Sequence, residues 1–187
     1  MNALFAKFKN NLNGFWIFFI AIFLFNFFVM LAPILKLFKY DEVADGIYFG
    51  FSFTCHQLNS RSLCLFNNSI EDCTTNSSKL EYIKTNTVVK ENKIGYKLAV
   101  CARDVGIYFS MLLGAIVWGF INKKDLKNID QPPLLFFILS LIPIGIDGLG
   151  QLMGLWESSN QIRLISGFIA GFACVFYVIP LINRILD

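Results

Sequence analysis

The amino-acid sequence predicts an all-α integral membrane protein, a bundle in which four helices cross the bilayer. Hydrophobic residues make up 56% of the 187 residues and charged residues only 16%, whereas soluble domains are usually about 45–50% apolar. The charged residues lie mostly outside four long apolar stretches, and a helix needs about 20 apolar residues to cross the hydrocarbon core. These observations predict a single membrane domain over residues 1–187.

Each predicted span is an apolar stretch with few polar residues. Only Asn26 is polar between Phe15 and Leu35, and Asp147 is the one charged residue of the third span. Small residues recur every four positions in the second and fourth spans, which permits close approach of neighbouring helices in lipid. The spans are expected at residues 15–36, 104–121, 133–156 and 163–183, and the small residues are Gly106, Ser110, Gly114, Gly167 and Gly171.

Lysine residues predict how the spans are oriented. The short link between the second and third spans contains Lys123, Lys124 and Lys127, and short positively charged links usually face the cytoplasm. Lys7 and Lys9 precede the first span and agree with a cytoplasmic N-terminus. With four spans, the C-terminus is then also expected in the cytoplasm.

The same orientation places residues 37–103 outside. Charged residues interrupt the moderately apolar stretch 44–66, so an interfacial or re-entrant helical segment is expected there. Residues 67–93 are polar and are expected to form an exposed insertion of loop with a short hairpin. Cys64 and Cys73 are expected to form a disulfide, because an outer compartment is oxidising.

Four residues that are expected at the outer surface could bind a metal ion. Cys55, His56, Cys101 and Asp104 offer two thiols, an imidazole and a carboxylate, which are ligand types that zinc accepts. Adjacent residues of a regular helix cannot both bind easily, so either a turn separates Cys55 from His56 or only one of them is a ligand. A Cys55–Cys101 disulfide is the alternative, and the sequence leaves both possibilities open.

A second set of polar residues lies near the outer ends of the later spans. An ionised aspartate in mid-membrane costs about 2.5–3.5 kcal/mol, so Asp147 needs a partner, for which Arg103 and Arg163 are candidates. Guanidinium groups also match anionic head groups, although each arginine could instead pair with an acidic residue. The catalytic candidates are Asp147, Gln151, Asn160 and Arg163, and the substrate-binding candidates are Arg61, Arg103 and Tyr108.

These residues give the sequence a resemblance to a prokaryotic family of integral membrane proteins called domain of unknown function 2085. The resemblance extends over about residues 45–175, and it implies a membrane protein whose activity the family name leaves undefined. Asp104 stands where many members have Cys, an exchange that a metal ligand tolerates, and Trp156 stands where many have Arg. The matching motifs are Cys55-His56-Gln57, Arg61-Ser62, Cys101-Ala102-Arg103-Asp104, Gly106-Ile107-Tyr108, Pro143, Asp147-Gly148 with Gln151, Glu157-Ser158 with Asn160 and Arg163, and Gly167.

Two functions remain open from the sequence. One is a metal-assisted enzyme, with zinc as the expected cofactor, that acts on a lipid-linked or amphiphilic substrate. The other is a non-enzymatic binding or assembly protein whose Cys/His cluster is a structural metal site or a disulfide knot. Membrane lipids are the expected partners and no nucleic-acid partner is expected, because the few charged residues and the net charge of +3 bear on membrane orientation rather than on nucleic acid. No phosphate-binding loop or protease motif identifies a reaction.

Overall fold

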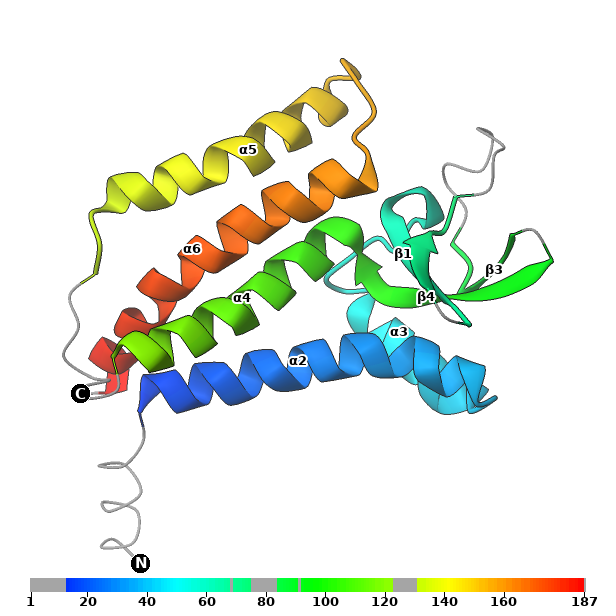
Figure 1. The fold of residues 1–187 in the computed structure, drawn as a ribbon, viewed down its shortest axis with the longest axis horizontal. Helices are drawn as coiled ribbons and strands as arrows, with labels where there is room; N and C mark the ends of the chain where they lie inside the picture. The colour runs from blue at the N-terminus through cyan, green and yellow to red at the C-terminus, as the bar shows by residue number, and fades with distance from the viewer. Residues whose placement is uncertain (1–12, 68, 75–83, 91, 123–130, 187) are drawn as a thin grey trace, which may run out of the picture.

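The protein is a bundle of four long helices with a small antiparallel sheet at one end (Figure 1). The computed structural model describes residues 13–67, 69–74, 84–90, 92–122 and 131–186. Four of the described helices are long and apolar enough to cross a membrane, which is the number of spans that the sequence predicts. They are α2 (Gly14–Leu37), α4 (Ala102–Ile121), α5 (Leu134–Leu152) and α6 (Asn160–Leu186).

Helices α4 and α6 pack closely through their glycines. A methyl group on Gly167 would lie 2.4 Å from the carbonyl oxygen of Arg103, and one on Gly106 would lie 2.4 Å from that of Leu164. The small residues at four-residue spacing therefore allow the two backbones to touch, as expected. In Figure 1, α6 lies between α5 and α4, and α2 forms the opposite edge of the bundle.

Amide side chains join α2 to the other helices. Asn26 donates to the carbonyl oxygen of Ile22 in its own helix at 2.8 Å and to that of Tyr108 in α4 at 2.9 Å. At the other end of α2, the Asn183 side chain accepts a hydrogen bond from the Gly14 N–H at 2.8 Å. Both contacts satisfy polar groups that hydrocarbon could not, so Asn26 has a structural role.

The sheet corrects the all-α prediction. Residues 44–66 were expected to be helical, but the helix ends at Phe51, and a short 3₁₀ turn (Asn59–Arg61) leads into the first strand. The insertion expected at 67–93 contributes two edge strands, and its residues 68, 75–83 and 91 lie outside the described residues. The elements are α3 (Asp41–Phe51), β1 (Ser62–Phe66), β2 (Ser69–Asp72), β3 (Thr87–Lys90) and β4 (Lys93–Cys101), in strand order β2-β1-β4-β3.

The strands were not predicted because the buried residues of β1 are not the most apolar ones. Strand β1 alternates strictly, but its buried residues are Ser62, Cys64 and Phe66, while the two leucines between them are only half-buried. The apolar alternation that indicates a strand is therefore hidden. The expected Cys64–Cys73 disulfide is confirmed and joins β1 to the residue after β2.

Candidate functional site

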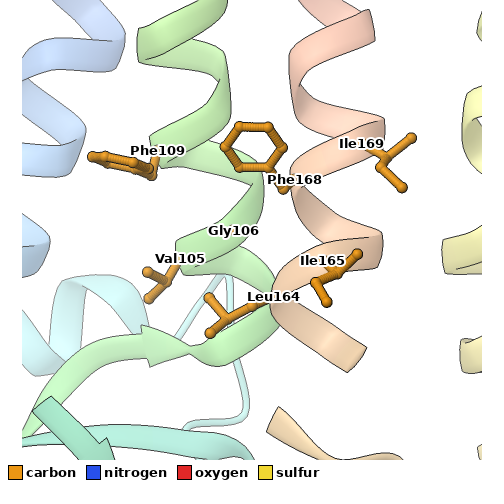
Figure 2. A pocket seen from close by; sticks show the side chains of 7 residues that line it. All are labelled: Val105, Gly106, Phe109, Leu164, Ile165, Phe168 and Ile169. Carbon is orange, nitrogen blue, oxygen red and sulfur yellow. The ribbon is translucent and has the colours of Figure 1, made fainter. Parts of the chain in front are cut away.

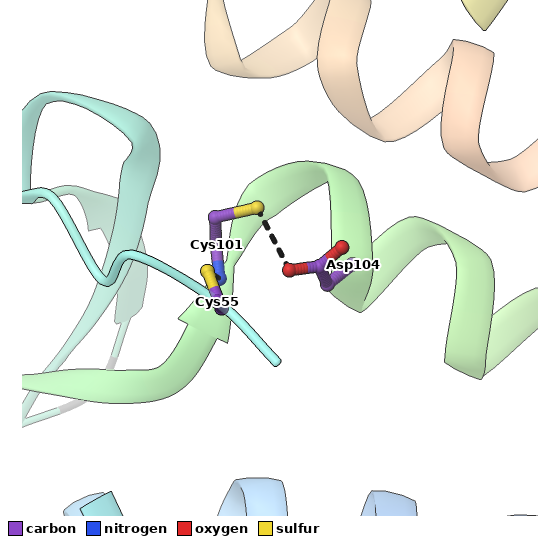
Figure 3. Close-up of side chains that lie close together, drawn as sticks. All are labelled: Cys55, Cys101 and Asp104. Carbon is purple, nitrogen blue, oxygen red and sulfur yellow. Dashed lines mark hydrogen bonds between the residues drawn. The ribbon is translucent and has the colours of Figure 1, made fainter. Parts of the chain in front are cut away.

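The structure brings together Cys55, Cys101 and Asp104 at the start of α4. Their sulfur and carboxylate oxygen atoms all lie within 4.8 Å of one another. The Cys101 thiol donates to Asp104 at 3.1 Å (Figure 3), and the Cys55 sulfur accepts the Cys101 backbone N–H at 3.2 Å. Both thiols are free, so the Cys55–Cys101 disulfide is not formed. Two sulfur atoms and a carboxylate are a donor set that fits zinc.

A tight turn after Cys55 separates it from His56. Gln57 has φ 51°, in the left-handed region, and its side chain donates to the carbonyl oxygens of Tyr48 at 2.8 Å and Ala99 at 2.9 Å. These two bonds hold the segment between α3 and β4. Cys55 is buried as a result, whereas His56 is exposed and does not join the group of possible ligands.

The position of the two thiols favours ionisation of Cys55. Hydrogen bonding with Cys101 lowers the pKa of Cys55, and the Gln57 N–H, 3.4 Å from the sulfur, adds to the effect against the opposing effect of burial. The same hydrogen bond, together with burial and the nearby Asp104, raises the pKa of Cys101. Cys101 occupies the N-cap position of α4, and its side chain makes no capping hydrogen bond. Cys55 is therefore the first thiol to become a thiolate, the form that binds metal ions.

Lys97 is a buried cation near Cys55 that the sequence analysis missed. Its side chain is 1% exposed and donates to the Gln57 carbonyl oxygen at 2.7 Å and to Asn59 at 3.3 Å. Burial lowers its pKa to about 8, while the charge of Cys55 acts in the opposite direction. A signal existed in the sequence, because this lysine directly precedes the apolar residues Leu98, Ala99 and Val100, all buried.

An ion pair between Arg103 and Asp147 joins α4 to α5. Asp147 was expected to need such a partner, and Arg103 was one of the two candidates. Asp147 Oδ1 and Arg103 Nε are buried and make no hydrogen bond to any described residue. The ion pair therefore leaves one buried acceptor and one buried donor without a hydrogen bond to the described residues.

Arg163 is the centre of a polar network beside this ion pair. It is 5% exposed and donates to Asn160 at 2.9 Å and to the Ser60 carbonyl oxygen at 3.4 Å. When the Gln151 amide is oriented with its oxygen toward the two arginines, that oxygen accepts hydrogen bonds from Arg163 at 2.7 Å and from Arg61 at 3.2 Å. Arg163 Nε makes no hydrogen bond within the part of the chain that the structure describes.

The network continues from Asn160 into the sheet. The Asn160 side chain donates to Asp72 at 2.9 Å and to the Ser62 carbonyl oxygen at 3.4 Å. Arg61, Arg103, Asp147 and Cys101 are all close enough to Arg163 to interact with it electrostatically. The cluster of Cys55, Cys101 and Asp104 and the arginine network around Arg163 therefore form one polar region at the sheet end of the bundle. Glu157, by contrast, is exposed.

Helices α4 and α6 also form an apolar groove that shares no residue with this polar region. It has a volume of about 230 Å³, and Figure 2 shows the residues that line it on the two helices. None of the lining residues is charged or polar, so the groove offers no chemistry of its own. The lining residues are Val105, Gly106, Phe109, Leu164, Ile165, Phe168 and Ile169.

The fold and the site define a multi-pass helical membrane protein with a thiol- and arginine-rich site at one end. Residues 93–177 match the family model described as "Predicted membrane protein (DUF2085)". An uncharacterised protein of Methanocaldococcus jannaschii, MJ1492, is 36% identical over 168 residues, which cover 90% of this chain and 87% of that protein. The chain therefore belongs to the family called domain of unknown function 2085.

A second archaeal relative matches a shorter part of the chain. An uncharacterised protein of Methanothermobacter thermautotrophicus is 36% identical over 77 residues, or 41% of this chain and 66% of that protein. No solved structure matches the chain.

Proposed function

We propose that the protein is a metal-assisted membrane enzyme that binds zinc through Cys55, Cys101 and Asp104 and acts on an anionic lipid-linked or amphiphilic substrate. The observation that carries the proposal is the set of three ligand atoms within 4.8 Å. Catalytic zinc usually has three protein ligands and one open position, whereas structural zinc is enclosed by four. The adjoining arginine network supports an anionic substrate.

The residues of the chain divide into distinct roles under this proposal. A bound zinc ion would act as a Lewis acid toward a carbonyl or phosphoryl oxygen. Arg61 and Arg163, held by Gln151, bind the anionic group of the substrate, with Asn160 fixing the Arg163 side chain. Asp147, held at one oxygen by Arg103, accepts a hydrogen bond or a proton at its other oxygen.

Metal content measured by elemental mass spectrometry on the detergent-purified protein tests the proposal. We expect about one zinc per chain in the wild type, from the single group of three ligands, and loss of the zinc in Cys101→Ser. Cys174→Ser is the matched control, because Cys174 is also a free, half-buried thiol but is not in the group. His56→Ala should also keep the zinc.

Two results would count against the enzyme. If metal is absent and both Cys55 and Cys101 titrate as free thiols, the metal centre is wrong. If X-ray absorption shows zinc bound by four protein ligands, the centre is structural, and the protein is then a binding or assembly protein.

We also propose that both termini lie in the cytoplasm and that the site faces the outer side of the membrane. The lysines behind this prediction lie outside the described residues. The Cys64–Cys73 disulfide supports it, because structural disulfides persist in oxidising compartments. A green fluorescent protein fused after the C-terminus should fluoresce, and an alkaline phosphatase fused there should be inactive. The opposite pattern would reverse the orientation.

A further inference from the structure

A second apolar groove lies between α2 and α3, and it has a volume of about 380 Å³. This volume is in the range of sites that bind small molecules, about 300–1,000 Å³. The four α2 residues follow i, i+3, i+4, i+7 spacing and so share one face of the helix. The lining residues are Ala21, Leu24, Phe25 and Phe28 from α2, and Ile47, Gly50, Phe51 and Thr54 from α3 and the turn after it.

The location of the groove indicates what fills it. One wall belongs to α2, which is a candidate membrane span, so the groove opens toward hydrocarbon. The other wall belongs to α3, whose start is tied to α2 by ion pairs of Lys36 with Asp41 at 2.8 Å and with Asp45 at 2.9 Å. Beyond these polar contacts, Phe49 and Phe53 are 68% and 79% exposed. A helix with this pattern lies at the membrane interface, where the available apolar molecules are lipid chains.

Packed side chains connect the wall of the groove to the proposed metal site. The Phe25 ring packs edge-on against Phe51, with ring centroids 4.9 Å apart, and against Tyr108, with centroids 4.5 Å apart. Tyr108 lies one turn after Asp104 on the same face of α4. Thr54, at the end of the groove wall, directly precedes Cys55, and Phe51 and Cys55 belong to one buried cluster.

We infer that the groove between α2 and α3 binds the hydrocarbon chain of a membrane lipid, so that the polar end of this lipid lies beside Cys55, Cys101 and Asp104. The inference names the substrate of the proposed enzyme as a lipid and rests on the proposed function to that extent, although binding of the chain does not require the metal. The groove between α4 and α6 has no wall at the expected membrane interface, because both of its helices are candidate membrane spans.

Two glycines of α3 allow a matched test. Neither Gly50 nor Gly46 would bring a Cβ atom within 4 Å of another group, and both are exposed and helical. Leucine should improve helix propensity equally at the two positions. Only Gly50 lines the groove, so Gly50→Leu fills it, whereas Gly46→Leu, one turn earlier, leaves it open.

The experiment uses the full chain in phosphatidylcholine vesicles that contain a phosphatidylglycerol probe with a photoactivatable diazirine in one acyl chain. We expect labelled peptides from α2 and α3 in the wild type and in Gly46→Leu, and a several-fold loss of that labelling in Gly50→Leu. A second probe, with the diazirine in the head group, should label the peptides that contain Cys55 and Cys101, with the same dependence on Gly50. Zinc content is measured on the same samples.

The outcomes separate this inference from the proposed function. Equal labelling of the wild type and Gly50→Leu, or equal losses in both leucine variants, would overturn the groove as a lipid site. Head-group labelling that avoids the peptides of Cys55 and Cys101 would overturn the placement of the polar end. If no sample contains zinc but Gly50→Leu alone loses labelling, the groove is supported and the metal-assisted enzyme fails.

Discussion

Replacing Arg103 by Met is expected to destabilise the bundle more than replacing its ion-pair partner Asp147 by Asn. The Asp147 side chain is only 4% exposed, whereas that of Arg103 is 24% exposed. Removing one partner of a buried ion pair costs about 3–5 kcal/mol, because the remaining charge has no partner. Arg103→Met leaves the deeply buried carboxylate without its partner and should cost about 3 kcal/mol.

Asp147→Asn should be the milder change, because the amide still accepts a hydrogen bond from a guanidinium that is partly exposed. Its cost should be that of weakening one charged hydrogen bond, about 1–2 kcal/mol. The double variant should cost less than the sum of the two single variants, with a coupling of about 2 kcal/mol. Unfolding in mixed detergent micelles with increasing sodium dodecyl sulfate, followed by circular dichroism, measures all four proteins. Equal costs for the single variants, or costs that simply add, would refute the asymmetry.

Three further predictions concern the sheet and the helix contact. Lys97 has a pKa of about 8 in the folded protein, so the unfolded chain binds more protons between about pH 8 and the ordinary lysine pKa of about 10.4. Over this range the wild type should therefore gain stability relative to Lys97→Met as the pH rises. Denaturant titrations of both metal-free proteins at several pH values measure this, and a free energy of unfolding that changes equally with pH in the two proteins would contradict it. Replacing both Cys64 and Cys73 by Ala should lower the free energy of unfolding by about 2–4 kcal/mol, and an unchanged melting temperature would show that the disulfide closes no constrained loop. Gly167→Ala should cost about 1–3 kcal/mol, because its methyl group would collide with a carbonyl oxygen of α4. Gly145→Ala, with open space around it, should be neutral or slightly stabilising in the same micelle unfolding assay.

The membrane helices could be predicted because lipid demands long uninterrupted apolar stretches, and few other structures satisfy that demand. The partner of Asp147 could be narrowed to two arginines because an unpaired charge is so costly there. The sequence could not show that Arg103 rather than Arg163 pairs with Asp147. The answer depends on how α5 packs beside α6 and on whether the Arg103 side chain extends from α4 to α5.

The ligand set was predictable in part. Residue chemistry alone grouped Cys55, Cys101 and Asp104 with His56, but the left-handed turn at Gln57 directs the imidazole away. Residues with a side chain rarely adopt this conformation, so nothing in the local sequence announces the turn. The sheet was missed because β4 is buried on both faces at Leu98 to Val100, and such a stretch does not alternate.

The strand order of the sheet also explains how the chain can carry extra residues near a site without disturbing it. Strands β2 and β3, which flank residues 73–86, are the two edges, whereas the central strands β1 and β4 lead to Arg61 and Cys101 at their ends. Residues added between β2 and β3 leave the pairing of β1 with β4 intact, because β2 and β3 lie at the edges of the sheet. A compact marker protein inserted there would add mass and a recognisable shape for imaging in the electron microscope while leaving the membrane helices untouched.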